Sequence, residues 1–238
     1  MTAGERSTDN GIECAGCPAR AQSFCGAIPG RGLEALSRSR QLIQFYRRQT
    51  IVCQGAPAVS FFNVVSGIVK LYRSLSDGRT QIIGFCFPGD FFATSETDKY
   101  STTAEAVTFV ETCRFPRSRL KRLAHQFPEL QTSLMERSFR HAAILEDQLV
   151  LLGRMTARER IVRFLLRYGA GPEDTKASAG RHIHLPMTRT DIADFLGLTS
   201  ETVSRVLTSL ARENLITVSV SHSVRLINVE LLRRISCK

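Results

Sequence analysis

The chain has 238 residues, enough for two modest domains, and carries a formal net charge of +10. The basic excess favours a polyanionic partner, and it is larger in residues 154–238 than in residues 1–153. The first residues are polar and no apolar run approaches about 20 residues, so the sequence shows no signal peptide or membrane span and predicts a cytoplasmic protein.

Three cysteines lie close together near the N-terminus, at Cys14, Cys17 and Cys25. Their segment, residues 1–30, has little hydrophobic periodicity, so we expect an arm without a core of its own. Cysteines of a cytoplasmic protein remain mostly thiols. Thiolates ligate iron–sulfur clusters and structural zinc, and both usually take four protein ligands.

The fourth ligand has three candidates elsewhere in the chain. Cys113 lies between a strand-like run and the start of a helix. Cys86 lies in an alternating run, where the role of a small buried hydrophobe is favoured. Cys53 is also in a strand-like stretch. Cys237, beside the C-terminus, is expected to be incidental.

Residues 31–125 consist of short alternating runs punctuated by glycine and are predicted to form a β-domain. Several short, evenly spaced strands are typical of a small barrel or roll. The expected elements are strands at 61–67, 68–75 and 80–87, turns at 76–79 and 88–90, and further strands at 104–110 and 112–115.

A long helix is expected over residues 127–155, and we assign residues 126–153 to it as a separate segment. Apolar or small residues recur in it at alternating steps of four and three, which predicts a narrow seam for a second helix. The seam consists of Ser138, Ala142, Leu145, Leu149 and Leu152. The nearby Leu134, Met135 and Phe139 are expected to pack on the chain's own β-domain.

Residues 154–238 are predicted to form a second domain. It opens with an amphipathic helix at 157–167, followed by a Gly/Ala/Ser-rich loop at 169–181 and a strand from residue 182. His182 and His184 alternate with apolar residues on this strand. We therefore expect them to face solvent rather than to hold a metal.

Two short helices joined by a tight turn follow at residues 187–214. Thr188 is expected to cap the first helix in a capping box with Asp191. Gly197 supplies the turn, because glycine tolerates the backbone of such a corner. Thr199 is expected to cap the second helix, whose buried face is formed by Val203, Leu207 and Leu210. This pattern predicts a helix-turn-helix, whose second helix enters the DNA major groove.

The opposite face of the second helix carries polar residues suited to reading bases. Arg205 can bond the O6 and N7 atoms of a guanine, and Glu201 can accept from a cytosine amine. Glu201 and Arg205 can also be an ordinary surface pair, four residues apart on one helix. The whole stripe is Ser200, Glu201, Ser204, Arg205 and Thr208.

Residues 215–229 are predicted to form two strands around a turn at 221–223, the wing of a winged helix. Arg225 on this wing, with Thr188 and Arg189 at the first helix, is a candidate phosphate contact. Such contacts position a protein on DNA without reading its sequence. Thr199, at the cap of the second helix, is added to the candidate DNA contacts.

The segment LGLTSETVSRVL resembles the recognition segment of the CRP/FNR superfamily of transcription regulators. The order of Glu201, Ser204 and Arg205 is that of its FNR and FixK branches. The resemblance implies a homodimer that joins through the long helix and binds palindromes with half-sites of TTGA type. It also implies activation through contacts with RNA polymerase, for which the turn at 76–80 is a candidate.

The motifs GIVKLYR, DGRTQ and PGDFF resemble the double-stranded β-roll of cyclic-nucleotide-binding domains. The expected fold class is therefore α+β, with a β-roll, a long dimerisation helix and a C-terminal winged helix-turn-helix. Nucleotide-binding members hold the cyclic phosphate with an acidic residue and an Arg-Ser pair. The corresponding stretch here, residues 90–106, contains no arginine, so we expect no cyclic nucleotide.

For the cysteines, the resemblance implies an oxygen-labile 4Fe–4S cluster held by Cys14, Cys17, Cys25 and Cys113. The gap before Cys25 is similar to that of the FnrN and FnrL types. The alternatives are a FixK-like regulator without a working cluster, controlled by abundance or thiol oxidation, and a zinc-bound form. An enzyme is disfavoured, because the sequence has no Gly-rich phosphate loop, no Ser/His/Asp arrangement and no carboxylate pair in a recognisable context.

Overall fold

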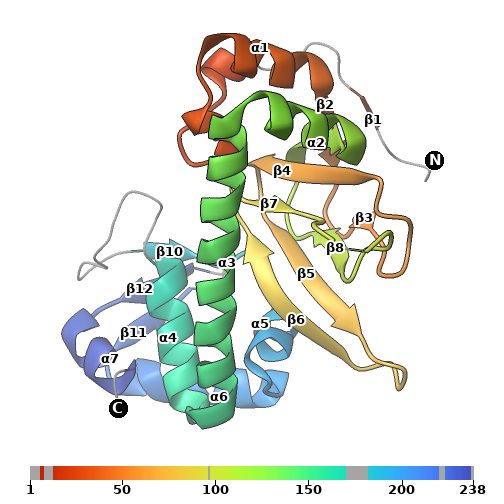
Figure 1. Cartoon of the computed structure of the whole chain (residues 1–238). Coiled ribbons are helices and arrows are strands. Elements are labelled where there is room, and N and C mark those ends of the chain that lie inside the picture. The colour runs from red at the N-terminus through yellow and green to blue at the C-terminus, as the bar shows by residue number, and fades with distance from the viewer. Residues whose placement is uncertain (1–5, 8–12, 96, 170–181, 220–222, 237–238) are drawn as a thin grey trace. The chain divides into compact units, whose positions relative to one another are not determined.

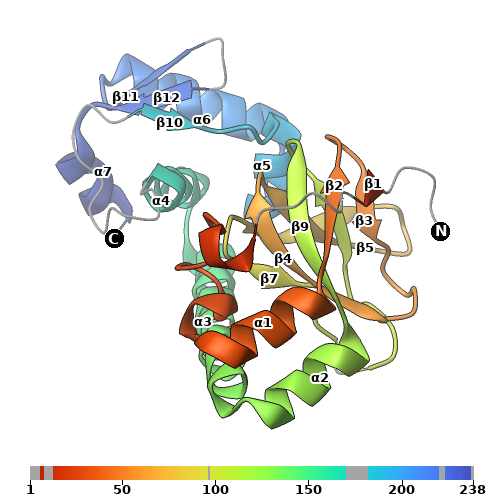
Figure 2. The same ribbon diagram turned by 90° about the horizontal axis from the view of Figure 1, so that it is seen from above.

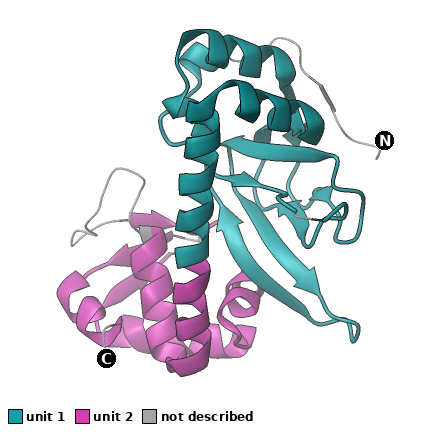
Figure 3. Ribbon diagram, viewed as in Figure 1, with its two compact units in different colours: residues 1–143 teal, residues 144–238 magenta. Residues whose placement is uncertain are grey.

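The computed structural model describes residues 6–7, 13–95, 97–169, 182–219 and 223–236 (Figure 1). The chain divides into a first unit, residues 1–143, and a second unit, residues 144–238, and the division falls inside the long helix α3 (Pro128–Arg154) (Figure 3). Within the described residues, no helix has the length and apolar character needed to cross a membrane. Residues 170–181 of the expected loop, residues 221 and 222 of the expected wing turn, and Cys237 lie outside the described residues.

Two antiparallel sheets form the body of the first unit. One has the strand order β1-β2-β9-β4-β7 and the other the order β3-β8-β5-β6. This arrangement confirms the predicted β-roll. The strands are β1 (Arg6–Ser7), β2 (Gln41–Phe45), β3 (Thr50–Val52), β4 (Ser60–Ser66), β5 (Val69–Ser74), β6 (Thr80–Cys86), β7 (Phe91–Phe92), β8 (Thr103–Ala106) and β9 (Val110–Pro116).

The five-stranded sheet is buried on both faces, because successive side chains of a strand point to opposite sides. On β4, Phe62 and Val64 belong to the core inside the roll, whereas Val65 belongs to a second core on the other face. On β9, Val110 belongs to the inner core and Cys113 to the second core. Alternation along β9 thus turns Cys113 away from the interior of the roll.

Helices cover this second core. They are the short 3-10 helices η1 (Cys14–Gly16) and η2 (Phe24–Ala27), then α1 (Gly30–Ser39), α2 (Arg117–Gln126) and the start of α3. α1 and α2 lie side by side in both views (Figures 1 and 2). Each buries leucines, such as Leu36 of α1 and Leu120 of α2, against Phe24 and Phe115. The N-terminal cysteines are therefore carried on a helical layer over the sheet.

Three expectations for the first unit were wrong or incomplete. The run 104–110 is not one strand, because the chain turns after β8, where Val107 N donates to Ile68 O at 2.8 Å and Ile68 N donates to Thr108 Oγ1 at 3.0 Å. Met135 and Phe139 do not pack on the roll, since they are 53% and 67% exposed, although Leu134 does pack on the second core. Helix α1 was not foreseen.

The second unit contains the predicted helix-turn-helix and a small sheet. Its strands pair in the order β10-β12-β11, and α5 and α6 follow the predicted helices. This confirms the winged helix-turn-helix, with the additional helix α7 packed on α4. The elements are α4 (Ala157–Gly169), β10 (His182–His184), α5 (Arg189–Leu196), α6 (Ser200–Arg212), β11 (Ile216–Val218), β12 (Ser223–Leu226) and α7 (Val229–Ser236).

Candidate nucleic-acid interface and metal centre

The corner between α5 and α6 is built by local hydrogen bonds. Thr188 Oγ1 accepts from Asp191 N at 3.0 Å, and Asp191 Oδ2 accepts from Thr188 N at 2.9 Å, which completes a capping box. Gly197 ends α5 in the left-handed region, with φ of 61°. Thr199 then caps α6 by accepting from Thr202 N at 3.1 Å. These bonds set where the second helix begins.

Helix α6 buries one face and exposes the other. Val203, Leu207 and Leu210 are buried. On the exposed face, the Arg205 guanidinium donates a hydrogen bond to Thr202 Oγ1 at 3.3 Å rather than to the carboxylate of Glu201. Arg205 is therefore held at the level of the first turn of the helix, where recognition helices contact bases. The exposed side chains are Ser200, Glu201, Ser204, Arg205 and Thr208.

The candidate phosphate contacts lie on two elements of the second unit. Arg225 is exposed on β12, the central strand of the small sheet, between His182 of β10 and Thr217 of β11. Arg189 begins α5 and is partly buried, and this burial lowers the pKa of its guanidinium. His182 and His184 are exposed on β10. The roles of these residues in DNA binding stay predictions.

Two side chains attach α5 to its neighbours, and sequence reasoning missed both. Gln148 of α3 is buried and donates from Nε2 to the carbonyl of Phe195 at 2.8 Å. Arg160 of α4 donates to the carbonyls of Leu196, Leu152 and Met155 at 2.8, 2.8 and 2.9 Å. A charged guanidinium that satisfies helix-terminal carbonyls fixes the ends of these helices.

The four cysteines named as ligands gather in the first unit. Cys113 belongs to the second core, and Cys17 and Cys25 pack against that core. Cys14 receives a hydrogen bond from Arg40 Nε at 3.1 Å, and Arg40 interacts electrostatically with Cys113, Cys14 and Cys17. The four thiols thus interact within one part of the first unit, although they come from η1, its flank, η2 and β9.

Burial and mutual proximity set the state of these thiols. Burial raises the pKa of Cys113 to about 12; neighbouring Arg40 lowers the pKa and the thiols of Cys25, Cys14 and Cys17 raise it. Burial likewise raises the pKa of Cys25 to about 11, against a hydrogen bond from Ser23 that lowers it. Both thiols are therefore protonated at neutral pH, and a metal that bound here would displace their protons.

Among the described residues, two buried polar atoms near these cysteines have no hydrogen-bond partner. One is Oδ1 of Asn63, which lies directly across from Cys113 in the sheet, and the other is Nε of Arg137, which interacts electrostatically with Cys25. Buried polar atoms without partners are rare, and they are typical of a site that takes up an ion, a water molecule or a cofactor. Four thiols with such neighbours fit a thiolate-ligated group.

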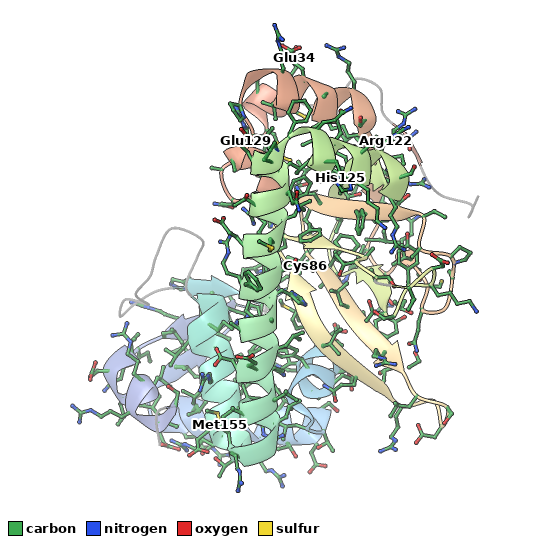
Figure 4. The ribbon with its side chains drawn as sticks, in the orientation of Figure 1. Glu34, Cys86, Arg122, His125, Glu129 and Met155 are labelled. Atoms are coloured by element: carbon green, nitrogen blue, oxygen red, sulfur yellow. The ribbon has the colours of Figure 1, made fainter. Side chains whose placement is uncertain are left out.

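The other cysteines lie elsewhere. Cys86, labelled in Figure 4, lies on β6 and belongs to the core inside the roll. Burial raises its pKa well above the ordinary value. Cys53 is exposed after β3. Within the described parts of the chain, no three His, Cys, Asp or Glu side chains are placed to hold a single metal ion. A 4Fe–4S cluster binds one cysteine per iron, so its ligands are spread more widely than those of one zinc ion.

The predicted dimer seam is exposed on α3. Leu149 is 72% exposed, Leu145 is exposed, and Met135 continues the same alternation of three- and four-residue steps. Met135 therefore extends the apolar stripe instead of packing on the roll. Ala142 is also exposed, and Leu152 is partly buried.

The loop that corresponds to the nucleotide-binding loop borders a cavity of about 610 Å³ in the first unit. The lining contains hydroxyl groups and aromatic rings, and Lys121 is the charged side chain among the lining residues described. Arg117 of α2 donates to the carbonyls of Ser95 and Thr97, both at 2.7 Å, and so holds the backbone of this loop. That cyclic nucleotides do not bind stays a prediction.

Comparisons with known proteins agree with this architecture. Residues 159–235 match the Crp-like helix-turn-helix domain family, and residues 42–127 match the cyclic nucleotide-binding domain family. The chain is 34% identical over 209 residues to the nitrogen fixation regulation protein FixK of Bradyrhizobium diazoefficiens, covering 88% of each chain. It is 35% identical to the transcriptional activatory protein AadR of Rhodopseudomonas palustris, covering 93% of this chain and 92% of AadR.

An FNR-type relative and a solved structure extend this likeness. The chain is 30% identical to the transcriptional activator protein FnrL of Cereibacter sphaeroides, covering 85% of this chain and 83% of FnrL. The structure of FixK2 from Bradyrhizobium japonicum matches with a TM-score of 0.75 and 34% identity, over 82% of this chain and 96% of FixK2. The chain therefore belongs to the CRP/FNR family: it is a DNA-binding transcription regulator related to FixK and the FNR-type activators, not an enzyme.

Proposed function

We propose that this regulator activates transcription in response to low oxygen, binding TTGA-type palindromes as a homodimer while a 4Fe–4S cluster is intact. The observation that carries the proposal is that Cys113 interacts electrostatically with Cys14, Cys17 and Cys25, and that Arg40 donates a hydrogen bond to Cys14 and interacts with Cys17 and Cys113. A reducing compartment preserves such thiols, so the proposal places the protein in the cytoplasm.

The second unit supplies the reading of DNA. Glu201, Ser204 and Arg205 project from the first two turns of α6, which is the part of a recognition helix that meets base edges. Arg205 would bond a guanine and Glu201 would accept from a cytosine, while Ser200 and Thr199 lie at the helix start. Thr188, Arg189 and Arg225 would contact phosphates and fix the register.

The α3 seam would join a second copy of the chain, whose α6 helix would contact the other half of the operator. Ala142, Leu145, Leu149 and Leu152 repeat at coiled-coil spacing, and the stripe is exposed in a single chain. Joining two copies through this stripe buries apolar surface and places two α6 helices on one DNA molecule. A homodimer on a two-fold operator is the consequence.

The cysteines supply the sensing. Cys14 begins η1, Cys17 directly follows it, Cys25 lies in η2, and Cys113 lies on β9 of the sheet. Ligation by all four would tie the helical layer of residues 13–28 to β9, because the ligand set does not exist in the untied chain. When bound, the cluster supplies a link that oxygen destroys. The chain then loses the restraint between its N-terminal segment and β9.

The turn between β5 and β6 is the proposed contact with RNA polymerase. Asp77 and Arg79 form a 2.7 Å ion pair at its tip, and Arg79 N donates to Asp77 Oδ1 at 3.0 Å. Both side chains are exposed, so the turn presents a fixed pair of charges to a partner.

A second reading keeps DNA binding and changes the signal. The relatives include two FixK proteins, 34% and 36% identical to this chain, as well as FnrL, which is 30% identical. In this reading, the regulator has no working cluster and is controlled by its abundance, by thiol oxidation or by zinc.

Anaerobic purification followed by iron and sulfide analysis and a visible absorption spectrum distinguishes the two readings. The proposal predicts four irons and four sulfides per chain, with absorption that bleaches in air. Colourless protein without inorganic sulfide contradicts the cluster. Zinc in that protein would identify the zinc-bound alternative.

A further inference from the structure

Two arginine side chains from distant parts of the chain approach the four-cysteine site. Arg40 directly follows α1, and Arg137 lies in the N-terminal half of α3. Both belong to the first unit. Neither residue is part of a sequence motif. The fold brings each of them close to the cysteines.

Sheet register brings Arg40 to the site. The next two residues, Gln41 and Leu42, pair across β2 and β9 with Arg114 and Cys113. Arg40 therefore lies two residues before Leu42, the strand partner of Cys113, while its side chain reaches Cys14, 26 positions earlier in the chain. The bond from Nε to the Cys14 sulfur is 3.1 Å long.

Arg137 approaches the same site with an unused donor. Its Nη1 atom donates to the carbonyl of Gly89 at 3.4 Å, whereas its Nε atom is buried and has no hydrogen-bond partner in the part of the chain that the structure describes. It interacts electrostatically with Cys25. A buried donor left without an acceptor destabilises the fold, and the nearby sulfur is an acceptor that a thiolate would strengthen.

We propose that Arg40 and Arg137 are the paired counter-ions of the four-cysteine centre and donate N–H···S hydrogen bonds to it. This inference rests on the proposed function, because it needs a centre held by Cys14, Cys17, Cys25 and Cys113. Four thiolates around a 4Fe–4S core of charge 2+ leave two negative charges. Two guanidinium groups balance them, and a buried charge without a partner is unfavourable.

The pair also sets how easily the centre gains an electron. Reduction adds a negative charge, which nearby cations and N–H···S bonds stabilise, so these groups raise the reduction potential. Replacing either arginine with an uncharged residue of similar length should lower the potential. Lysine retains the charge but not the planar, directed donors, so its effect should be intermediate. Both arginines are positioning residues, since the cysteines are the ligands.

The test compares Arg40→Met, Arg40→Lys, Arg137→Met and Arg137→Lys with the wild-type chain. The control is Arg38→Met. Arg38 lies on α1, two residues before Arg40, and its side chain is 80% exposed and pairs with Glu34. The readouts are iron and sulfide per chain, the midpoint potential from an anaerobic redox titration, and the Fe–S stretching frequencies by resonance Raman spectroscopy. Circular dichroism reports whether each variant folds.

We expect a lower potential and shifted Fe–S frequencies in both Met variants, a smaller change in the Lys variants, and wild-type values in Arg38→Met. The Lys variants keep the test informative if a Met variant fails to fold. If variants at both positions bind iron and sulfide and keep the wild-type midpoint potential and Fe–S frequencies, the counter-ion proposal is overturned. The proposal of a cluster is not affected by that result. A wild-type chain that takes up no iron overturns the centre itself, and the counter-ion proposal with it.

Discussion

The Nη1 atom of Arg160 lies 2.8 Å from the carbonyl oxygen of Leu196, the last residue of α5. The same guanidinium bonds the carbonyls of Leu152 and Met155 at the end of α3. α6 follows α5 through the turn at Gly197. One side chain of α4 therefore fixes the helix that leads into the recognition helix.

Replacing Arg160 with methionine should destabilise the second unit by about 2 kcal/mol, because three helix-terminal carbonyls lose a charged donor. Urea unfolding measures the change. Arg163→Met is the control, since Arg163 lies on the same helix and makes a 3.6 Å ion pair with Asp147. Equal midpoints for the two variants would show that Arg160 does not hold α5.

Leu149→Glu should weaken the dimer by more than about tenfold, or ~1.4 kcal/mol, because it places like charges across the seam. Sedimentation equilibrium measures the association. Val150→Glu is a matched control, since Val150 is the adjacent residue, is 55% exposed and lies off the seam. A Leu149→Glu variant that associates as tightly as Val150→Glu would place the interface elsewhere.

Arg205→Ala should cost roughly 1–3 kcal/mol on the specific operator and relax the preference at one base pair. Arg225→Ala should instead weaken binding to all sequences similarly and reduce the salt dependence by about one counter-ion. Fluorescence anisotropy with a set of singly substituted operators separates the two effects. Unchanged base preference in Arg205→Ala removes that residue from base reading.

Cys113→Ser should abolish retention of iron and sulfide in protein prepared without oxygen, because one ligand of the centre is lost. Cys53→Ser is the control, since Cys53 is exposed and lies outside the cluster of thiols. Iron and sulfide analysis of both proteins provides the measurement. Full iron content in Cys113→Ser would exclude Cys113 as a ligand.

The pair of Arg158 and Glu213 predicts one pH dependence. Two hydrogen bonds of 2.6 Å from Arg158, together with one from Ser209, lower the pKa of Glu213 from its ordinary 4.5 to about 2. A carboxylate with a lowered folded-state pKa stabilises the fold above its unfolded pKa and loses this contribution as the pH falls from about 4.5 to about 2. The stability difference between wild type and Glu213→Gln, followed by urea unfolding, should therefore shrink across this window. A difference that does not change with pH contradicts the ion pair.

Local patterns were sufficient to predict the helix-turn-helix of the second unit. The cap of α6 joins Thr199 to Thr202, and its buried residues repeat within the helix, so every signal lies within a few residues. The turn after β8 could not be predicted in the same way. Its bonds join residues 107 and 108 to residue 68, and the apolar run across it resembles one continuous strand.

The cysteine site shows where sequence reasoning ends. The alternating run favoured Cys86 as a small buried hydrophobe, but only the family resemblance selected Cys113 as the fourth ligand. The face toward which each side chain points depends on which sheet face is covered by helices, and the sequence does not show this. Arg40 and Arg137 were missed, since their approach to the thiols is created by strand register and by the packing of α3. Met135 and Phe139 were misassigned because an apolar residue on a helix does not reveal whether its partner is the same chain or another copy.

Operator affinity measured by fluorescence anisotropy without oxygen, and again on the same sample after exposure to air, tests the central claim most directly. The account predicts tight, palindrome-specific binding by the anaerobic protein and a loss of at least tenfold in affinity, about 1.4 kcal/mol, after air. Equal affinity before and after exposure would contradict oxygen sensing through the four cysteines.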